Sequence, residues 1–127
     1  MMTRRNKYNA VRTEYKGRNY DSKAEAAYAH GLDVLLMAGQ LRYVSPQPVF
    51  YLAGNSYRAN FLVEDNDGKL VVVDVKGMDT AAFKRIKKNW QAVGPSMPLV
   101  VIGRNRDGSF YERERVQRFA SIEDQAQ

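Results

Sequence analysis

The segment Leu70–Val75, Leu-Val-Val-Val-Asp-Val, constrains the fold more than any other part of the chain. Successive side chains of a strand point to opposite faces of a sheet, so a strand with one solvent-exposed face alternates apolar and polar residues. Here nearly every position is apolar, which predicts a strand in the middle of a sheet that is covered on both faces. The rest of the chain must therefore supply a layer on each side.

The sequence predicts that a helix beginning after residue 21 forms one of these layers. Ser22 suits the N-cap, Glu25 stands three residues later as the second half of a capping box, and an alanine-rich run follows. Gly39 suits the position just past the helix end, where a left-handed backbone favours glycine. The sequence therefore predicts a helix between Ser22 and Gly39.

A second helix is predicted to begin at Asp79 or Thr80 and to end at Gly94-Pro95. Apolar residues recur along it at helical spacing, which predicts a buried stripe of Phe83, Ile86, Trp90 and Val93. An apolar strand at 98–102 follows. A strand, a helix and a strand in this order predict a right-handed crossover to a parallel neighbour.

Between the helices we expect three strands in a meander, at Val49–Leu52, 57–63 and Leu70–Val75, with residues 41–48 as a lead-in containing two prolines. The predicted order is αβββαβ, an α/β fold with a mixed sheet flanked by helices. Short segments around Lys16-Gly17 predict a hairpin, and residues 110–119 fit either a strand or a helix. Residues 1–12 are polar and basic without period, which favours a flexible arm.

Composition sets the class of protein. A chain of 127 residues is of ordinary size for a single domain, so we expect one hydrophobic core. It has no cysteine and one histidine, which excludes disulfide frameworks and Cys/His zinc sites. No stretch reaches the roughly 18 apolar residues of a membrane span, and the start Met-Met-Thr-Arg-Arg lacks the apolar region of a secretory signal. We therefore expect an intracellular protein.

The charge balance points to a polyanionic partner. Twenty Lys and Arg against fourteen Asp and Glu give a net charge of +6, and the pI is about 9.7. The basic residues crowd the first eighteen positions and the second predicted helix. Charge alone is weak evidence, because many basic proteins never contact nucleic acid.

The pair Asp74 and Lys76 is the most informative chemical feature. Strand alternation puts both side chains on one face, with Val75 pointing the other way. In a metal-dependent phosphodiester hydrolase, a carboxylate binds the hard cation, and a lysine orients water and offsets charge on the phosphate. An acid and a base at this spacing also form plain surface pairs. The apolar run before them and Gly77 after them favour the functional interpretation.

Glu25 is the candidate for a second carboxylate. Ala29, Leu32 and Leu36 lie at helical spacing from it, so it begins the stripe that packs. A buried carboxylate needs a partner, and a cation shared with Asp74 would provide one. The alternative is that Glu25 serves only in the capping box.

Together these segments resemble a known nuclease family. The Ser-Lys-Ala-Glu helix start, the strand with Tyr57-Arg58-Ala59-Asn60-Phe61, and Val73-Asp74-Val75-Lys76-Gly77 before a basic helix resemble the PD-(D/E)XK nucleases. Within that superfamily the chain is similar to small bacteriophage enzymes related to endonuclease I and to Holliday junction resolvases. The resemblance covers roughly residues 15–102. It implies that Glu25, the residue at position 60 and Asp74 hold Mg²⁺, with Mn²⁺ as a substitute, that Lys76 assists the water, and that Gln47 borders the site.

The chain departs from this family at position 60. Members carry aspartate there, whereas this chain has Asn60, which keeps a carbonyl oxygen but removes the negative charge. A neutral amide is a poorer Mg²⁺ ligand. Either the substitution was made to inactivate an enzyme and trap an uncleaved complex, which we favour, or the chain is a natural member with a lost or relaxed metal site. Both alternatives predict DNA binding with slow or absent cleavage.

The candidate DNA-binding residues lie in the two basic segments. For the second helix the alternative is a solvated outer face. Tyrosines 8, 15 and 20 are compatible with stacking on unpaired bases, and for Tyr15 and Tyr20 the alternative is packing of the hairpin. Trp90 is expected in the core, and His30 in a structural role. The candidates for DNA contact are Arg4, Arg5, Lys7, Arg12, Thr80, Lys84, Lys87 and Lys88.

The expected function is structure-specific endonuclease action on branched DNA in the cytoplasm of a bacterial host cell, since the resemblance is to phage enzymes. Resolving a four-way junction takes two symmetric incisions, which favours a homodimer. The alternatives are a restriction-like or nicking nuclease on duplex DNA, a non-catalytic DNA-binding protein on a nuclease scaffold, and, more weakly, a small RNA-binding protein.

Overall fold

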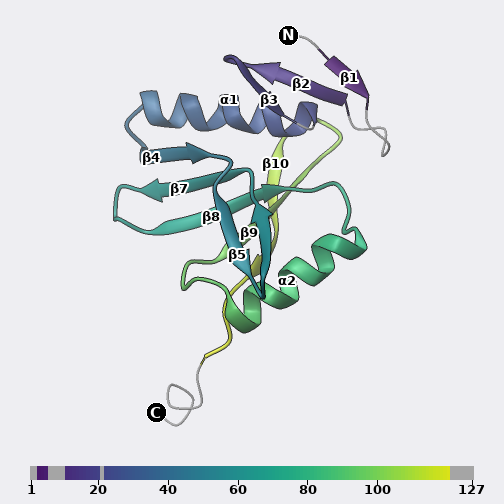
Figure 1. The fold of residues 1–127 in the computed structure, drawn as a ribbon. Helices are drawn as coiled ribbons and strands as arrows, with labels where there is room; N and C mark the ends of the chain where they lie inside the picture. The colour runs from purple at the N-terminus through teal and green to yellow at the C-terminus, as the bar shows by residue number, and fades with distance from the viewer. Residues whose placement is uncertain (1–2, 6–10, 21, 121–127) are drawn as a thin grey trace.

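A mixed five-stranded sheet forms the centre of the molecule (Figure 1). The computed structural model describes residues 3–5, 11–20 and 22–120. The sheet order is β10-β9-β8-β7-β4, from Phe110–Val116, Leu99–Arg104, Leu70–Val75, Phe61–Asp65 and Leu41–Pro46. The middle strand, β8, is parallel to β9, and the other pairs are antiparallel. The predicted α/β class, the central strand and the parallel crossover are confirmed.

The two helices begin and end close to the predicted residues. Helix α1 spans Lys23–Met37, with the Ser22 hydroxyl accepting from the Glu25 amide at 3.1 Å and Gly39 at φ 73°. Helix α2 spans Ala81–Val93. Its N-cap is Thr80, whose hydroxyl accepts from the Phe83 amide at 3.1 Å. Local capping signals are therefore sufficient to locate both helices.

The expected buried stripe of α2 is wrong at its last member. Phe83 and Trp90 are fully buried and Ile86 half-buried, but Val93 is 53% exposed. At ~100° per residue, Val93 lies about 80° around the helix from Phe83, farther than Trp90. The stripe thus rotates off the core within three turns.

The strands between the helices differ from the expected meander. Residues 41–48 were expected as a lead-in, but Leu41–Pro46 is strand β4, whose edge position tolerates a terminal proline. The expected strand at 57–63 is divided into β6, Asn55–Arg58, and β7. Strand β6 pairs with β5, Val49–Leu52, in a separate two-stranded sheet. The αβββαβ order holds for the main sheet with β4, β7 and β8 as its three strands.

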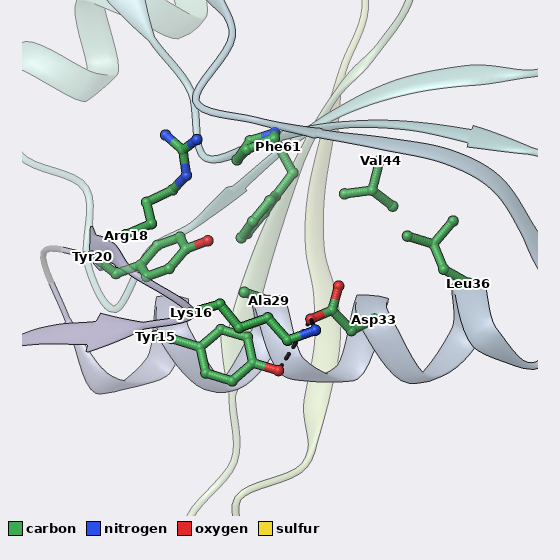
Figure 2. A pocket seen from close by; sticks show the side chains of 10 residues that line it. Tyr15, Lys16, Arg18, Tyr20, Ala29, Asp33, Leu36, Val44 and Phe61 are labelled. Carbon is green, nitrogen blue, oxygen red and sulfur yellow. Dashed lines mark hydrogen bonds and ion pairs between the residues drawn. The ribbon is translucent and has the colours of Figure 1, made fainter. Parts of the chain in front are cut away.

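The N-terminal residues form a small sheet of their own. Strand β2, Val11–Tyr15, pairs with β3, Arg18–Tyr20, so the predicted hairpin is confirmed. Lys16 at φ 51° and Gly17 at φ 75° form its turn. Strand β1, Thr3–Arg5, adds to β2, which corrects part of the expected arm, because the free edge of β2 can pair with extended backbone. Residues 6–10 lie outside the described residues. Figure 2 shows the hairpin against α1, with Tyr20 near Phe61 of β7.

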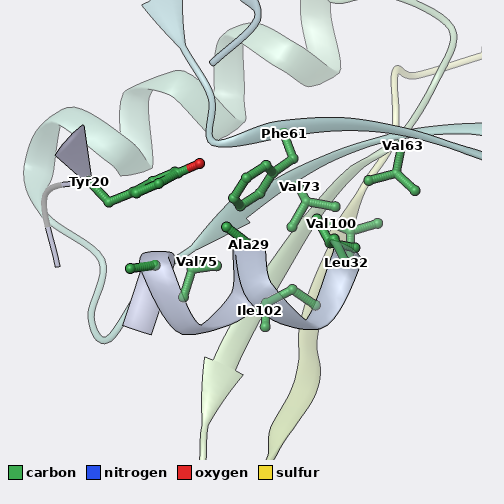
Figure 3. Packing of buried hydrophobic residues seen from close by; sticks show 10 residues of the cluster. Tyr20, Ala29, Leu32, Phe61, Val63, Val73, Val75, Val100 and Ile102 are labelled. Carbon is green, nitrogen blue, oxygen red and sulfur yellow. The ribbon is translucent and has the colours of Figure 1, made fainter. Parts of the chain in front are cut away.

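Both faces of β8 are buried, each in its own apolar cluster. Val73 and Val75 face α1, among Ala26, Ala29 and Leu32 (Figure 3). Val72 faces the other way, in the cluster that contains Phe83 and Trp90 of α2. Alternation along β8 puts Asp74 on this second face.

No helix in the described part of the chain is long and apolar enough to span a membrane.

Candidate active site

Asp74 and Lys76 lie together at the carboxyl end of the central strand, as the alternation predicted. The Asp74 carboxylate is 1% exposed, and the Lys76 ammonium lies 3.6 Å from its Oδ1 atom. The Lys76 side chain is 34% exposed, and its Nζ atom is 5.1 Å from the centre of the Phe83 ring. The pair is therefore no surface ion pair: the carboxylate is inside the protein and the ammonium leads from it toward solvent.

Tyr57 is a third member of this group, which the sequence analysis did not identify. Its hydroxyl donates a hydrogen bond to Asp74 Oδ2, and the side chain is 6% exposed. Burial raises the pKa of the Tyr57 phenol well above its ordinary value, and the nearby Asp74 carboxylate raises it further. The hydroxyl therefore stays protonated and donates. The only hint in the sequence is that Tyr57 begins the Tyr-Arg-Ala-Asn-Phe segment.

Asn60 lies between β6 and β7 and is bonded to β8 on both sides of Asp74. Its backbone amide donates to the Val73 carbonyl at 3.1 Å, and its Oδ1 atom accepts from the Val75 amide at 2.7 Å. The side chain thus extends the β7–β8 ladder past the end of β7. Gln47 lies beside it, because the Gln47 amide donates to the Asn60 carbonyl at 2.7 Å.

Glu25 is 8% exposed in the first turn of α1, as the buried stripe predicted. That helix covers the Val73 and Val75 face of the sheet, whereas Asp74 faces the α2 side. The structure thus brings Asn60, Asp74 and Lys76 together, and places Glu25 on the helix of the other face.

The oxygen donors fit a divalent cation only in part. The Asp74 carboxylate is a hard ligand of the kind that Mg²⁺ prefers. The Asn60 carbonyl oxygen, however, is neutral and already accepts the Val75 amide hydrogen bond. Among the described residues, no three His, Cys, Asp or Glu side chains gather into a metal site. Within the described part of the chain, Asp74 and Asn60 thus offer one charged and one neutral oxygen donor, which is an incomplete donor set for Mg²⁺.

Residues 5–105 match a family model described as "protein of unknown function (DUF1064)". The chain belongs to the DUF1064 family. The matched range contains every residue of the candidate site, from Glu25 to Lys76, and excludes β10. Comparison with curated proteins gives no match.

In this DUF1064 chain, one of the predicted DNA-contacting lysines is engaged within the protein. The Lys87 ammonium lies 2.5 Å from Asp79 and 2.8 Å from Glu114, and its side chain is 16% exposed. Arg113 of β10 completes an ion-pair network by binding Asp79, and it also donates to the Lys76 carbonyl at 3.5 Å. Hydrogen bonds from Lys87 and Arg113 hold the pKa of Asp79 below its ordinary value. The network ties the loop after Lys76 to α2 and β10.

The other predicted DNA-contacting residues are placed as follows. Lys84 and Lys88 are exposed on α2, and among the described residues no ion pair involves them or Arg85. Thr80 caps the helix. Arg4 and Arg5 lie in β1 and Arg12 in β2, but their side chains, and all of Lys7, fall outside the described part.

The tyrosines of the DUF1064 hairpin pack rather than project. Tyr20 is 5% exposed, and the Tyr15 hydroxyl donates to Asp33 Oδ2 of α1 at 3.0 Å and lies 3.0 Å from His30 Nδ1. Lys16 forms an ion pair with Asp33 at 2.9 Å, beside a cavity of about 180 Å³ (Figure 2). Of the two alternatives for Tyr15 and Tyr20, hairpin packing is confirmed, and His30 has the structural contact that was expected.

Proposed function

We propose that this chain is a metal-dependent, structure-specific DNA endonuclease of the Holliday junction resolvase type, acting on branched DNA, in which Asn60 impairs cleavage. The supporting observation is the buried Asp74 carboxylate with Lys76 beside it, at the end of the central strand. A carboxylate buried at the end of an apolar strand costs stability, and such costs concentrate at functional sites.

The residues around Asp74 have separable roles in this proposal. Tyr57 holds one carboxylate oxygen, which fixes the orientation of the side chain. Lys76 is partly exposed beside the other oxygen, where its ammonium can offset the negative charge of a phosphate. A divalent cation, once the donor set is complete, would supply Lewis acidity and an activated water.

Position 60 is well placed to complete that donor set. The Asn60 Oδ1 atom already accepts from the Val75 amide beside Asp74. An aspartate can make the same bond with one oxygen and present the second where the amide nitrogen now lies. The change Asn60→Asp should therefore preserve the fold while adding the missing charge.

The decisive experiment compares the chain with its Asn60→Asp variant on a labelled four-way junction and on a linear duplex, with Mg²⁺ and with chelator. We expect only the Asn60→Asp variant to cut DNA, and only when Mg²⁺ is present. We expect it to cut the four-way junction in preference to the linear duplex. The matched control combines Asn60→Asp with Asp74→Asn and should be inactive. Absence of metal-dependent cleavage of every DNA by the variant would contradict the proposal.

Branched DNA as the substrate is tested by competition. At equal phosphate concentration and fixed salt, a four-way junction should displace the labelled junction better than linear duplex does, because non-specific phosphate contacts are then matched. Equal competition would favour a restriction-like or nicking nuclease.

The proposal includes a homodimer, because two symmetric incisions require two sites. It also places the protein in the cytoplasm of a bacterial host. The mass of the DNA-bound protein at micromolar concentration tests it, and a monomeric mass would contradict it.

A second candidate is a non-catalytic DNA-binding protein on the same scaffold. It is favoured by the Asn60 side chain, which serves as a structural hydrogen-bond acceptor for β8. If the chain and its Asn60→Asp variant both bind DNA and neither cuts, this second candidate is correct.

A further inference from the structure

The β5–β6 hairpin is fixed to the candidate site through its inner face. Phe50 packs edge-on against Trp90 of α2, with ring centres 5.1 Å apart, and Tyr57 does so at 6.3 Å. Leu52 is buried in the same cluster, and the Tyr57 hydroxyl binds Asp74. The hairpin is therefore anchored to both α2 and β8, and its outer face has a defined place relative to the site.

That outer face carries an exposed aromatic ring beside an arginine. Tyr51 is 80% exposed, the most exposed aromatic side chain among the described residues. Tyr51 pairs with Ser56 and Val49 with Arg58 across the hairpin, so Tyr51 and Arg58 are diagonal neighbours on one face. Arg58 is exposed, and no ion pair within the described part of the chain involves it.

A groove of about 270 Å³ joins the hairpin to α2. Asn55 and Ser56 line it from the hairpin, and Arg85 and Asn89 from the helix, without any carboxylate. Lys84 and Lys88 are exposed on the same helix. The groove thus presents amide, hydroxyl and guanidinium groups, which complement a sugar-phosphate backbone, beside the apolar side chains of Leu52, Ala82 and Ile86.

We propose that the β5–β6 hairpin and α2 bind a DNA strand with unpaired bases, with Tyr51 stacking on a base and Arg58 and Arg85 contacting phosphates. This inference rests on the proposed function in taking DNA as the partner, and it specifies which part of branched DNA is recognised. Aromatic rings beside cations bind single strands by stacking, without sequence preference. Tyr20 is buried, and Tyr15 is half-buried with its hydroxyl bonded to Asp33, so Tyr51 is the more exposed ring.

The test measures binding in chelator, so that it does not depend on cleavage. Fluorescence anisotropy compares oligothymidylate with a fully paired duplex of equal phosphate number, for the parent, Tyr51→Ala and Tyr51→Phe. We expect Tyr51→Ala to weaken oligothymidylate binding about 10-fold and duplex binding less than about 2-fold, with Tyr51→Phe close to the parent. Arg85→Gln should weaken both and reduce the slope of log affinity against log salt by about one.

Tyr43→Ala is the matched control, because Tyr43 is also exposed, at 52%, but lies on edge strand β4. It should bind like the parent. Equal oligothymidylate binding by the parent and Tyr51→Ala would overturn the inference, as would tighter binding of an oligouridylate RNA. Junction cleavage by the Asn60→Asp variant without a Tyr51 effect would leave the endonuclease proposal standing. If Tyr51→Ala weakens oligothymidylate binding but the Asn60→Asp variant does not cleave, the strand-binding inference stands and the endonuclease proposal fails. Absence of all DNA binding would overturn both.

Discussion

Replacing Tyr57 by phenylalanine removes one oxygen from the most buried polar contact of the candidate site. Tyr57 is 6% exposed and its partner Asp74 1%. The ring keeps its packing against Phe50 and Trp90, so the change isolates the hydrogen bond. A hydrogen bond to a charged group contributes about 1.5–3 kcal/mol to the free energy of unfolding. With a urea m-value of about 2 kcal/mol/M for a domain of this size, we expect the midpoint to fall by about 1 M.

The assay is urea unfolding followed by fluorescence of Trp90, the single tryptophan. Tyr43→Phe is the control, because Tyr43 is exposed. Its effect on the free energy of unfolding should stay below about 0.5 kcal/mol, as for most surface substitutions. The same Tyr57→Phe change is then made in an Asp74→Ala background, where the hydroxyl has lost its acceptor. There it should be neutral or stabilising, because it removes an unsatisfied buried donor. An equal loss in both backgrounds would refute the reasoning.

Two further predictions concern the helix cap and the ion-pair network. Ser22→Ala should lower the free energy of unfolding by about 1 kcal/mol, measured by urea denaturation, because the hydroxyl accepts from the Glu25 amide; an unchanged midpoint would contradict this role. The pKa of Asp79 is lowered in the folded protein, so its pairing with Lys87 and Arg113 stabilises the protein at pH values above 3.8, the ordinary pKa of an aspartate. This contribution is lost as the pH falls through the lower pKa of the folded state. The stability difference between the parent and Asp79→Asn should therefore shrink in acid, and a difference that stays constant from neutral pH to acid pH would exclude this linkage.

The division of the expected strand 57–63 shows where pattern reasoning fails. Residues 55–65 are all extended, except at Ala59 and Asn60, so their apolar pattern gives no sign of a change of sheet. The Ala59 amide donates to the Pro48 carbonyl and the Asn60 amide to the Val73 carbonyl, so the two neighbours are bonded to different segments. A break of this kind is set by distant partners and not by local propensity.

The sequence by itself determined the two helices, the Lys16-Gly17 turn, the buried central strand and the shared face of Asp74 and Lys76. Each of these depends on strand alternation or on interactions between residues that are close together in the sequence, so the order of neighbouring residues is enough to predict them. Only the tertiary structure decided that Tyr57 binds Asp74, that Lys87 pairs with Glu114, and that Leu41–Pro46 joins the main sheet. These contacts join residues that are far apart in the sequence, and their partners are selected by the packing of the whole chain.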